Sequence, residues 1–166
     1  MNSIYQQIAQ LINTHAPEAG FVDLDKGQLD RPEDFDTLIP CVLVSAPETN
    51  WEDLRGGNQD GEGSIVVRWL FHLPTRTHPD DPLLSQSAEA LKYADTIHEV
   101  VMRQPDVLRR TRTRRYHAAN LPPNVYVVET TYAIRETYCR PVSSITKPPP
   151  TIETSFTIAP QTITHN

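Results

Sequence analysis

The chain has 166 residues, of which 38% are hydrophobic, and this is enough for one packed core plus short appendages. Its formal net charge of -6 argues against a general affinity for nucleic acid, because phosphates favour a basic surface. No basic segment followed by an apolar run opens the chain, and no apolar run approaches the roughly 18 residues that a membrane span needs. We therefore expect neither a secretory signal nor a segment embedded in a bilayer.

The first element has the spacing of an amphipathic helix over residues 2–15. Its apolar positions lie on one face: Ile4, Ile8, Leu11 and Ile12. Ser3 and Gln6 have the spacing of a capping box, which predicts a helix start near the terminus. The alternation in residues 21–25 then predicts a short strand in either register, and residues 27–36 form an acidic loop.

Two short apolar runs flank a polar stretch in the middle of the chain. Residues 39–44 and 64–71 are rich in β-branched side chains and bounded by turn residues, which is typical of strands. Residues 48–63 are polar and glycine-rich, so we expect a long hairpin with an acidic loop at its tip. Trp51 begins this loop, where it either covers the end of the core, which is favoured, or anchors an interface.

A second helix is expected after an irregular segment. Residues 72–82 contain three prolines and cannot form a regular element. Asp81 occupies the N-cap position and Pro82 the first helical position, and Pro105 follows the end. The apolar face covers about five turns: Leu84, Ala88, Leu91, Ala94, Ile97 and Val101.

Two further strands are expected after this helix. Residues 108–116 form an arginine-rich strand, residues 120–124 a turn, and residues 125–138 the longest strand. In the longest strand the even positions face one way: Tyr126, Val128, Tyr132, Ile134 and Tyr138. Cys41 lies inside a predicted strand and Cys139 ends another, which predicts two buried thiols without a disulfide framework or a metal clip.

The composition changes at residue 141. Five of the fifteen prolines lie in residues 141–166, so this part is a stiff, Pro-rich arm attached to the domain of residues 1–140. Apolar residues alternate with polar ones near its end, at Ile152, Phe156 and Ile158. One hypothesis is a strand-like tip that adds to a sheet edge of an adjacent subunit, and the alternative is a disordered tail.

Several residue groups have the types that metal sites and catalysis use. His72 and His78 lie in one loop with Asp80 and Asp81, and residues 23–36 contain many carboxylate side chains. No histidine pair has helical metal-ligand spacing, and no nucleophile motif, P-loop or dinucleotide fingerprint accompanies the acids. We therefore predict no catalytic, cofactor or metal residues. The alternative is a small metal-dependent hydrolase or nuclease that uses these loop carboxylates and histidines.

Arginine is concentrated in one part of the chain: Arg103, Arg109, Arg110, Arg112, Arg114 and Arg115. Guanidinium groups bind phosphates, so a DNA-binding accessory protein is one interpretation. The other is contact with acidic segments of a neighbouring protein, and this chain supplies such segments at residues 23–36 and 48–62. We favour the protein interface.

The order of elements and several apolar stretches resemble the tail-terminator proteins of bacteriophages and prophages, also called tail-completion or minor tail protein U-like proteins. The resemblance covers about residues 3–138. It is carried by these stretches: Ile4-Tyr5, Phe21-Val-Asp-Leu24, Ile39-Pro-Cys-Val-Leu-Val44 with Trp51, and Ser64-Ile-Val-Val67. It implies an α+β fold, with two helices packed on one face of a sheet. We expect about four to five strands, antiparallel or mixed.

The resemblance also implies a structural role in the virion. Subunits of the family form a ring, typically a hexamer, that ends the tail tube and presents a surface to the head-tail connector in the neck. Assembly would take place in the cytoplasm of the bacterial host, and DNA would pass through the lumen without sequence-specific binding or contact with a membrane. No catalytic residues are implied. The interface candidates are Trp51, Arg109, Arg110, Arg112, Arg114, Arg115, Ile152, Phe156 and Ile158.

Overall fold

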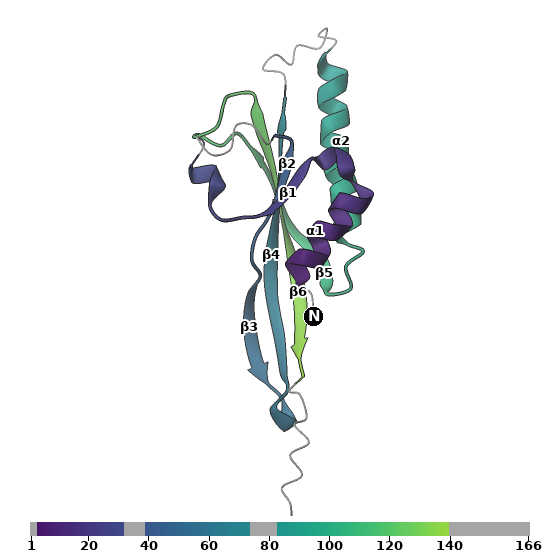
Figure 1. Cartoon of the computed structure of the whole chain (residues 1–166), viewed down its shortest axis with the longest axis vertical. Coiled ribbons are helices and arrows are strands. Elements are labelled where there is room, and N and C mark those ends of the chain that lie inside the picture. Colours follow the sequence, from purple (N-terminus) through teal and green to yellow (C-terminus); the bar gives the residue numbers. More distant parts are fainter. Residues whose placement is uncertain (1–2, 32–38, 74–82, 140–166) are drawn as a thin grey trace, which may run out of the picture.

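The computed structural model of the chain describes residues 3–31, 39–73 and 83–139. It is an α+β fold in which six strands form one mixed sheet and two helices pack on one face, as expected (Figure 1). The elements are α1 (Ile4–His15), β1 (Phe21–Leu24), β2 (Cys41–Val44), β3 (Glu48–Asp53), β4 (Gln59–His72), α2 (Leu83–Val101), β5 (Val107–Tyr116) and β6 (Val125–Tyr138). The predicted N-cap of α2 at Asp81 and Pro82 and the arm of residues 141–166 lie outside the described residues.

The longest pairing in the sheet joins β4 to β6. The two strands run antiparallel over all of their length, from Gln59 opposite Tyr138 to His72 opposite Val125, which is ~46 Å at 3.3 Å per residue. The strand order is β1-β2-β4-β6-β5, and only β1 and β2 pair in parallel. β3 pairs with the first part of β4, on the side where β2 pairs with the second part.

Both helices cover the same face of the sheet. The capping box of α1 is confirmed, because Ser3 Oγ accepts a hydrogen bond from the Gln6 amide and the Gln6 side chain accepts one from the Ser3 amide. Alternate residues of β4 and β6 meet the helices, as the even positions of residues 125–138 predict. The buried residues of this core include Ile4, Ile8, Ile12, Val67, Trp69, Ile97, Val101, Val128, Tyr132 and Ile134.

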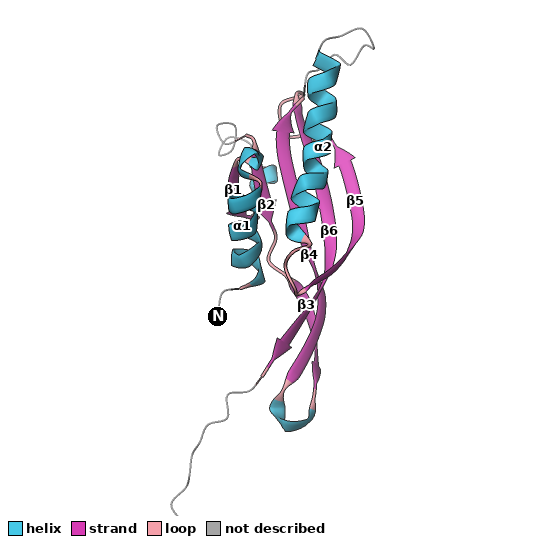
Figure 2. Ribbon diagram, turned by 90° about the vertical axis from the view of Figure 1, so that its right-hand side faces the viewer, coloured by secondary structure: helices cyan, strands magenta, loops and turns pink. Residues whose placement is uncertain are grey.

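The helix-free face carries a second, smaller apolar cluster, formed by Cys41, Leu43, Leu70, Leu121, Val125 and Val127. The buried thiol predicted at Cys41 is confirmed, and burial raises its pKa to about 12. Cys139 is exposed, so the prediction for it is wrong. The reason is that Cys139 follows the far end of β6, where the strand has passed beyond the helices (Figure 2).

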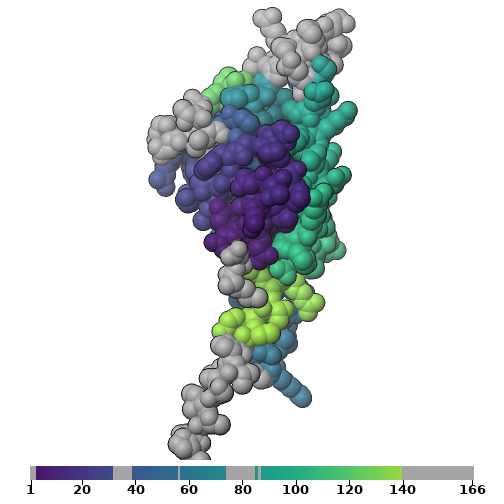
Figure 3. Space-filling model, turned by 45° about the vertical axis from the view of Figure 1, so that its right-hand side comes forward, coloured from purple at the N-terminus to yellow at the C-terminus, as the bar shows by residue number. Residues whose placement is uncertain are grey.

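Beyond the helices, β3 and the ends of β4 and β6 form a three-stranded projection, which we call the finger (Figures 2 and 3). The prediction that residues 48–63 form a loop is therefore wrong, since β3 and the start of β4 lie within them and only residues 54–58 connect the two strands. This adds one strand to the number expected. The segment is polar because both faces of the finger are open to water, and strands of this kind show no apolar alternation.

Two glycines of β4 allow the strands of the finger to approach closely. A Cβ atom at Gly63 would lie 2.1 Å from the carbonyl oxygen of Glu48, and one at Gly61 would lie 2.5 Å from a methyl group of Thr49. Because Gly61 and Gly63 have no side chains, Thr49 reaches across β4 and donates a hydrogen bond of 2.8 Å to the Glu136 carboxylate. Glycine within a strand often marks such a close approach of neighbouring backbone.

We expect Gly63→Ala to destabilise the protein by about 1–3 kcal/mol, because the new methyl group must displace the backbone of β3. Chemical denaturation gives the free energy of unfolding, and hydrogen exchange of the β3 amides locates the effect. Glu62→Ala, at the exposed neighbouring position, is the control and should change neither quantity. Equal stability of Gly63→Ala and the wild type would contradict the pairing of β3 with β4.

Candidate interaction surfaces

The outer strand β5 forms a basic edge of the sheet. It carries five arginines and no acidic residue: Arg109, Arg110, Arg112, Arg114 and Arg115. Arg114 lies 3.7 Å from Glu129, and Arg110 lies 3.9 Å from Asp95 on α2. The remaining three arginines form no ion pair with any described residue. Arg103 follows α2 and is not part of this strand.

The opposite edge of the sheet, in the finger, is acidic. β3 contains Glu48, Glu52 and Asp53 and no basic residue, and its outer side pairs with no other described strand. Asp60 of the adjacent β4 is held by Arg135, whose Nε lies 3.0 Å from the carboxylate. The hydrogen bond from Arg135 lowers the pKa of Asp60. In the described structure, the acids of β3 have no such cationic partner.

The two edges thus carry charges of opposite sign and lie on opposite sides of the β4–β6 pair (Figure 1). They are also staggered along it. β3 pairs with Gln59–Ser64 of β4, whereas β5 lies beside the part of β6 that pairs with Gly63–Leu70. The overlap is two rows across the sheet, one from Glu48 to Arg109 and one from Thr49 to Val107.

Large apolar side chains are exposed on both edges. Trp51 of β3 is 47% exposed, and Leu108 of β5 is 51% exposed. The prediction that Trp51 covers the end of the core is wrong, because β3 lies beyond the helices and the indole ring packs over Gly61 of the finger instead. Its alternative role as an interface anchor stays a prediction. Ile152, Phe156 and Ile158 lie outside the described residues.

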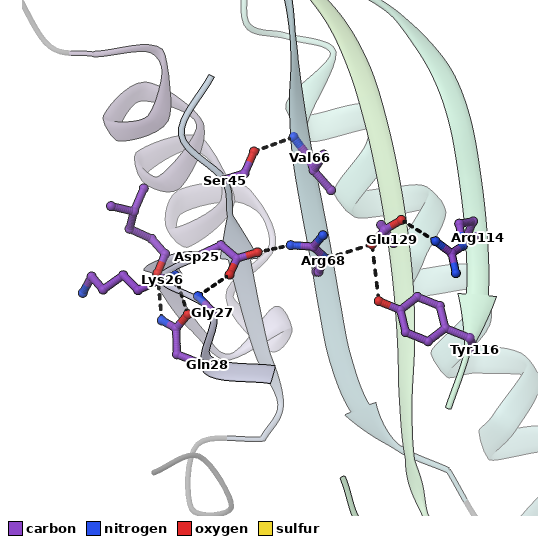
Figure 4. Close-up of polar contacts among 11 residues, drawn as sticks. Asp25, Lys26, Gly27, Gln28, Ser45, Val66, Arg68, Arg114, Tyr116 and Glu129 are labelled. Atoms are coloured by element: carbon purple, nitrogen blue, oxygen red, sulfur yellow. Dashed lines mark hydrogen bonds and ion pairs between the residues drawn. The ribbon is translucent and has the colours of Figure 1, made fainter. Parts of the chain in front are cut away.

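The helix-free face carries a row of charged side chains centred on Arg68 (Figure 4). Arg68 forms ion pairs with Asp25 and with Glu129, the latter at 2.8 Å. Glu129 also accepts a hydrogen bond of 3.3 Å from the Tyr116 hydroxyl, and Arg114 lies on its other side. Burial opposes the charge of Arg68, but the Glu129 hydrogen bond and the two carboxylates outweigh it and raise the pKa of the guanidinium group.

Sequence reasoning missed this row. Arg68 is the one charged residue within the apolar run 64–71, but its partners come from β6 and from the residue that follows β1. The row borders a hollow of about 440 Å³, which the loops after β1 and β5 also line. Because Arg68, Asp25 and Glu129 are already paired with one another, the row joins the strands and its own charges are not free for chemistry.

The residues of the predicted alternative metal site are not brought together where the structure describes them. Asp23 pairs with Lys26 and Asp25 with Arg68, and the His72 ring lies 3.1 Å from the Asn124 side chain. His78, Asp80 and Asp81 lie outside the described residues. Across residues 3–31, 39–73 and 83–139, no three His, Cys, Asp or Glu side chains come close enough to hold a metal ion. No helix in these ranges has the length and apolarity that a bilayer span requires.

Replacing Arg68 by Met should destabilise the protein by about 1–3 kcal/mol, because two nearly buried carboxylates lose their shared partner. Arg135→Met is a matched control, since the Arg135 side chain is 56% exposed and water replaces its pairing with Asp60. Denaturant unfolding of the two variants compares them directly. An Arg68→Met protein no less stable than Arg135→Met would show that the row contributes nothing to the fold.

Comparison of the chain with protein-family models and with curated proteins finds no match. A function for the chain must therefore be inferred from its own surfaces, of which the two oppositely charged sheet edges are the most distinctive.

Proposed function

We propose that the chain assembles head to tail with copies of itself, the basic edge of one subunit against the acidic edge of the next. The observation that carries this proposal is the opposite charge of β5 and β3 at the two edges of one sheet. Like edges repel each other, which disfavours a two-fold dimer through either edge, whereas unlike edges attract. A contact between two different surfaces closes into a ring when the rotation between subunits allows it.

The strand directions and the stagger are both compatible with such a ring. β3 and β5 run antiparallel within one subunit, so they also run antiparallel where neighbouring subunits in the same orientation meet. The stagger requires the strands to tilt relative to the ring axis, as strands tilt when a sheet closes into a barrel. The exposed Trp51 on one edge and Leu108 on the other supply apolar contacts beside the charges.

The function that we propose for this ring is structural and non-enzymatic. It ends the tail tube of a phage or prophage and joins the tube to the head-tail connector in the neck, with DNA passing through the lumen. The support is the sequence resemblance over residues 3–138, together with a fold that has the sheet and the two one-sided helices that the resemblance implies. Assembly in the host cytoplasm and a place in the virion belong to the same proposal.

Reversing two of the charges on one edge should prevent assembly. We expect Arg109→Glu with Arg112→Glu to lower the mass of the particle in solution, and Glu48→Arg with Glu52→Arg to do the same. An equimolar mixture of the two variants should assemble again, because the reversed β5 of one variant fits the reversed β3 of the other, and the unchanged β5 and β3 also fit each other. Native mass spectrometry at low salt measures all three samples. Subunits alternate in the mixture, so a ring closes only with an even number of copies.

The control is Lys92→Glu on the exposed side of α2, which should leave the mass unchanged. Assembly that survives both edge reversals, or a mixture that stays monomeric while each variant is folded, would refute the edge-to-edge contact.

The same variants test the alternative role of the arginines. Salt-sensitive binding of duplex DNA that Arg109→Glu with Arg112→Glu abolishes, in a protein that never assembles, would favour a DNA-binding accessory protein.

The C-terminal arm gives a separate prediction. If its apolar residues add to a sheet edge of the adjacent subunit, deletion of residues 141–166 should weaken the ring or its attachment to tails. A chain that ends at residue 158 retains Ile152, Phe156 and Ile158 and serves as the control. Particle mass and the fraction of tails joined to heads, counted by electron microscopy, are the measurements. Normal assembly and normal joining by the shorter chain would rule out a role for the arm.

A further inference from the structure

A hollow of about 430 Å³ lies on the helix side of the sheet, away from both charged edges. The first half of α2, the turn after α1 and the end of β4 surround it. Its lining residues are Glu18, Pro40, Trp69, Phe71, His72, Glu89, Ala90 and Tyr93. Three aromatic rings and two carboxylates thus line one hollow.

Packing fixes the positions of the aromatic rings. The Trp69 and Phe71 rings stack with their centroids 4.0 Å apart, and the Tyr93 ring lies 5.5 Å from Trp69 at an angle of 53°. Phe71 also meets Tyr126 edge to face at 5.8 Å. Trp69 and Phe71 are 5% and 4% exposed, so the core holds these rings in place and leaves only a small part of them at the hollow. Rings held in this way lose little entropy when a ligand binds.

The two carboxylates of the hollow lack a cationic partner in the described structure. Glu18 accepts a hydrogen bond of 2.7 Å from the Tyr93 hydroxyl, and this bond lowers the pKa of Glu18, so the group is ionised at neutral pH. Burial and the hydrogen bond to Glu18 raise the pKa of Tyr93 to about 12, so the phenol remains a donor. Glu89 is exposed on α2. The hollow therefore presents two negative charges beside an apolar, aromatic surface.

We propose that this hollow binds an arginine side chain presented by a partner protein. The methylene groups of arginine suit the apolar wall formed by Pro40 and Ala90, and its planar guanidinium group suits the partly exposed Tyr93 ring and the carboxylates of Glu18 and Glu89. Arginine is also enriched at protein interfaces. The site does not depend on the ring: it lies on the helix side, and none of its lining residues belongs to β3 or β5.

The peptide acetyl-Ala-Arg-Ala-amide is the probe, titrated into the full-length ¹⁵N-labelled protein. The reporter is the indole N–H of Trp69, which is buried without an acceptor in the described structure and is identified by loss of the other indole signal in Trp51→Phe. We expect a saturable shift of this signal with the arginine peptide. The matching peptides with norleucine or glutamate in place of arginine should produce no saturable shift.

Two variants separate a specific site from general attraction. Glu89→Gln should weaken binding of the arginine peptide by roughly two- to five-fold, the effect of one exposed ion pair. Glu99→Gln removes the same charge from the same helix outside the hollow and should leave the affinity unchanged. The proposal is overturned if the arginine peptide causes no saturable shift, if the norleucine peptide binds equally well, or if both variants weaken binding alike.

Discussion

The continuous pairing of β4 with β6 is the feature on which the remainder of the molecule depends. Along its second half, alternate residues are large and apolar, as at Val67, Trp69 and Val128, and the helices bury them. Along its first half the same face of β4 has Gly61 and Gly63, which have no side chains that the helices could bury. One uninterrupted ladder of backbone hydrogen bonds therefore divides into a body that the helices cover and a finger that they do not cover, and the glycines of β4 lie in the finger.

This division also explains why the sheet has two different edges. β5 runs beside the covered half, where bulges shift its register twice, and β3 runs beside the bare half. Exposed edge strands invite pairing with any other strand, and proteins limit this with charges and bulges. Charges of a single sign on both edges would disfavour every edge contact between copies of the chain. Opposite signs exclude only like edges, so the same residues that prevent indiscriminate pairing leave one contact open, between β5 and β3.

Sequence periodicity identified the elements that bury one face and missed the element that buries none. The capping box at Ser3, the apolar side of α1 and the alternation in β6 each reflect contact with the core, and contact with the core produces a pattern. β3 has no such pattern because water lies on both of its faces, and only its neighbours determine that it is a strand. The errors at Trp51 and Cys139 have the same origin. Both residues lie where the paired strands extend beyond the helices, and local composition does not indicate how far a pair of strands extends.

The charge distribution bears on how DNA would pass through the proposed ring. The chain carries a net charge of -6, although β5 contributes five positive charges. In a head-to-tail ring the five β5 arginines face the three acids of β3 at each contact, so much of the positive charge of the most basic segment is offset within the interface. The surface that remains exposed is acidic on balance and repels phosphate. An assembled ring would therefore let DNA move through without holding it, whereas an isolated subunit still exposes its arginines. In this way assembly itself would withdraw the arginines of β5 from the DNA.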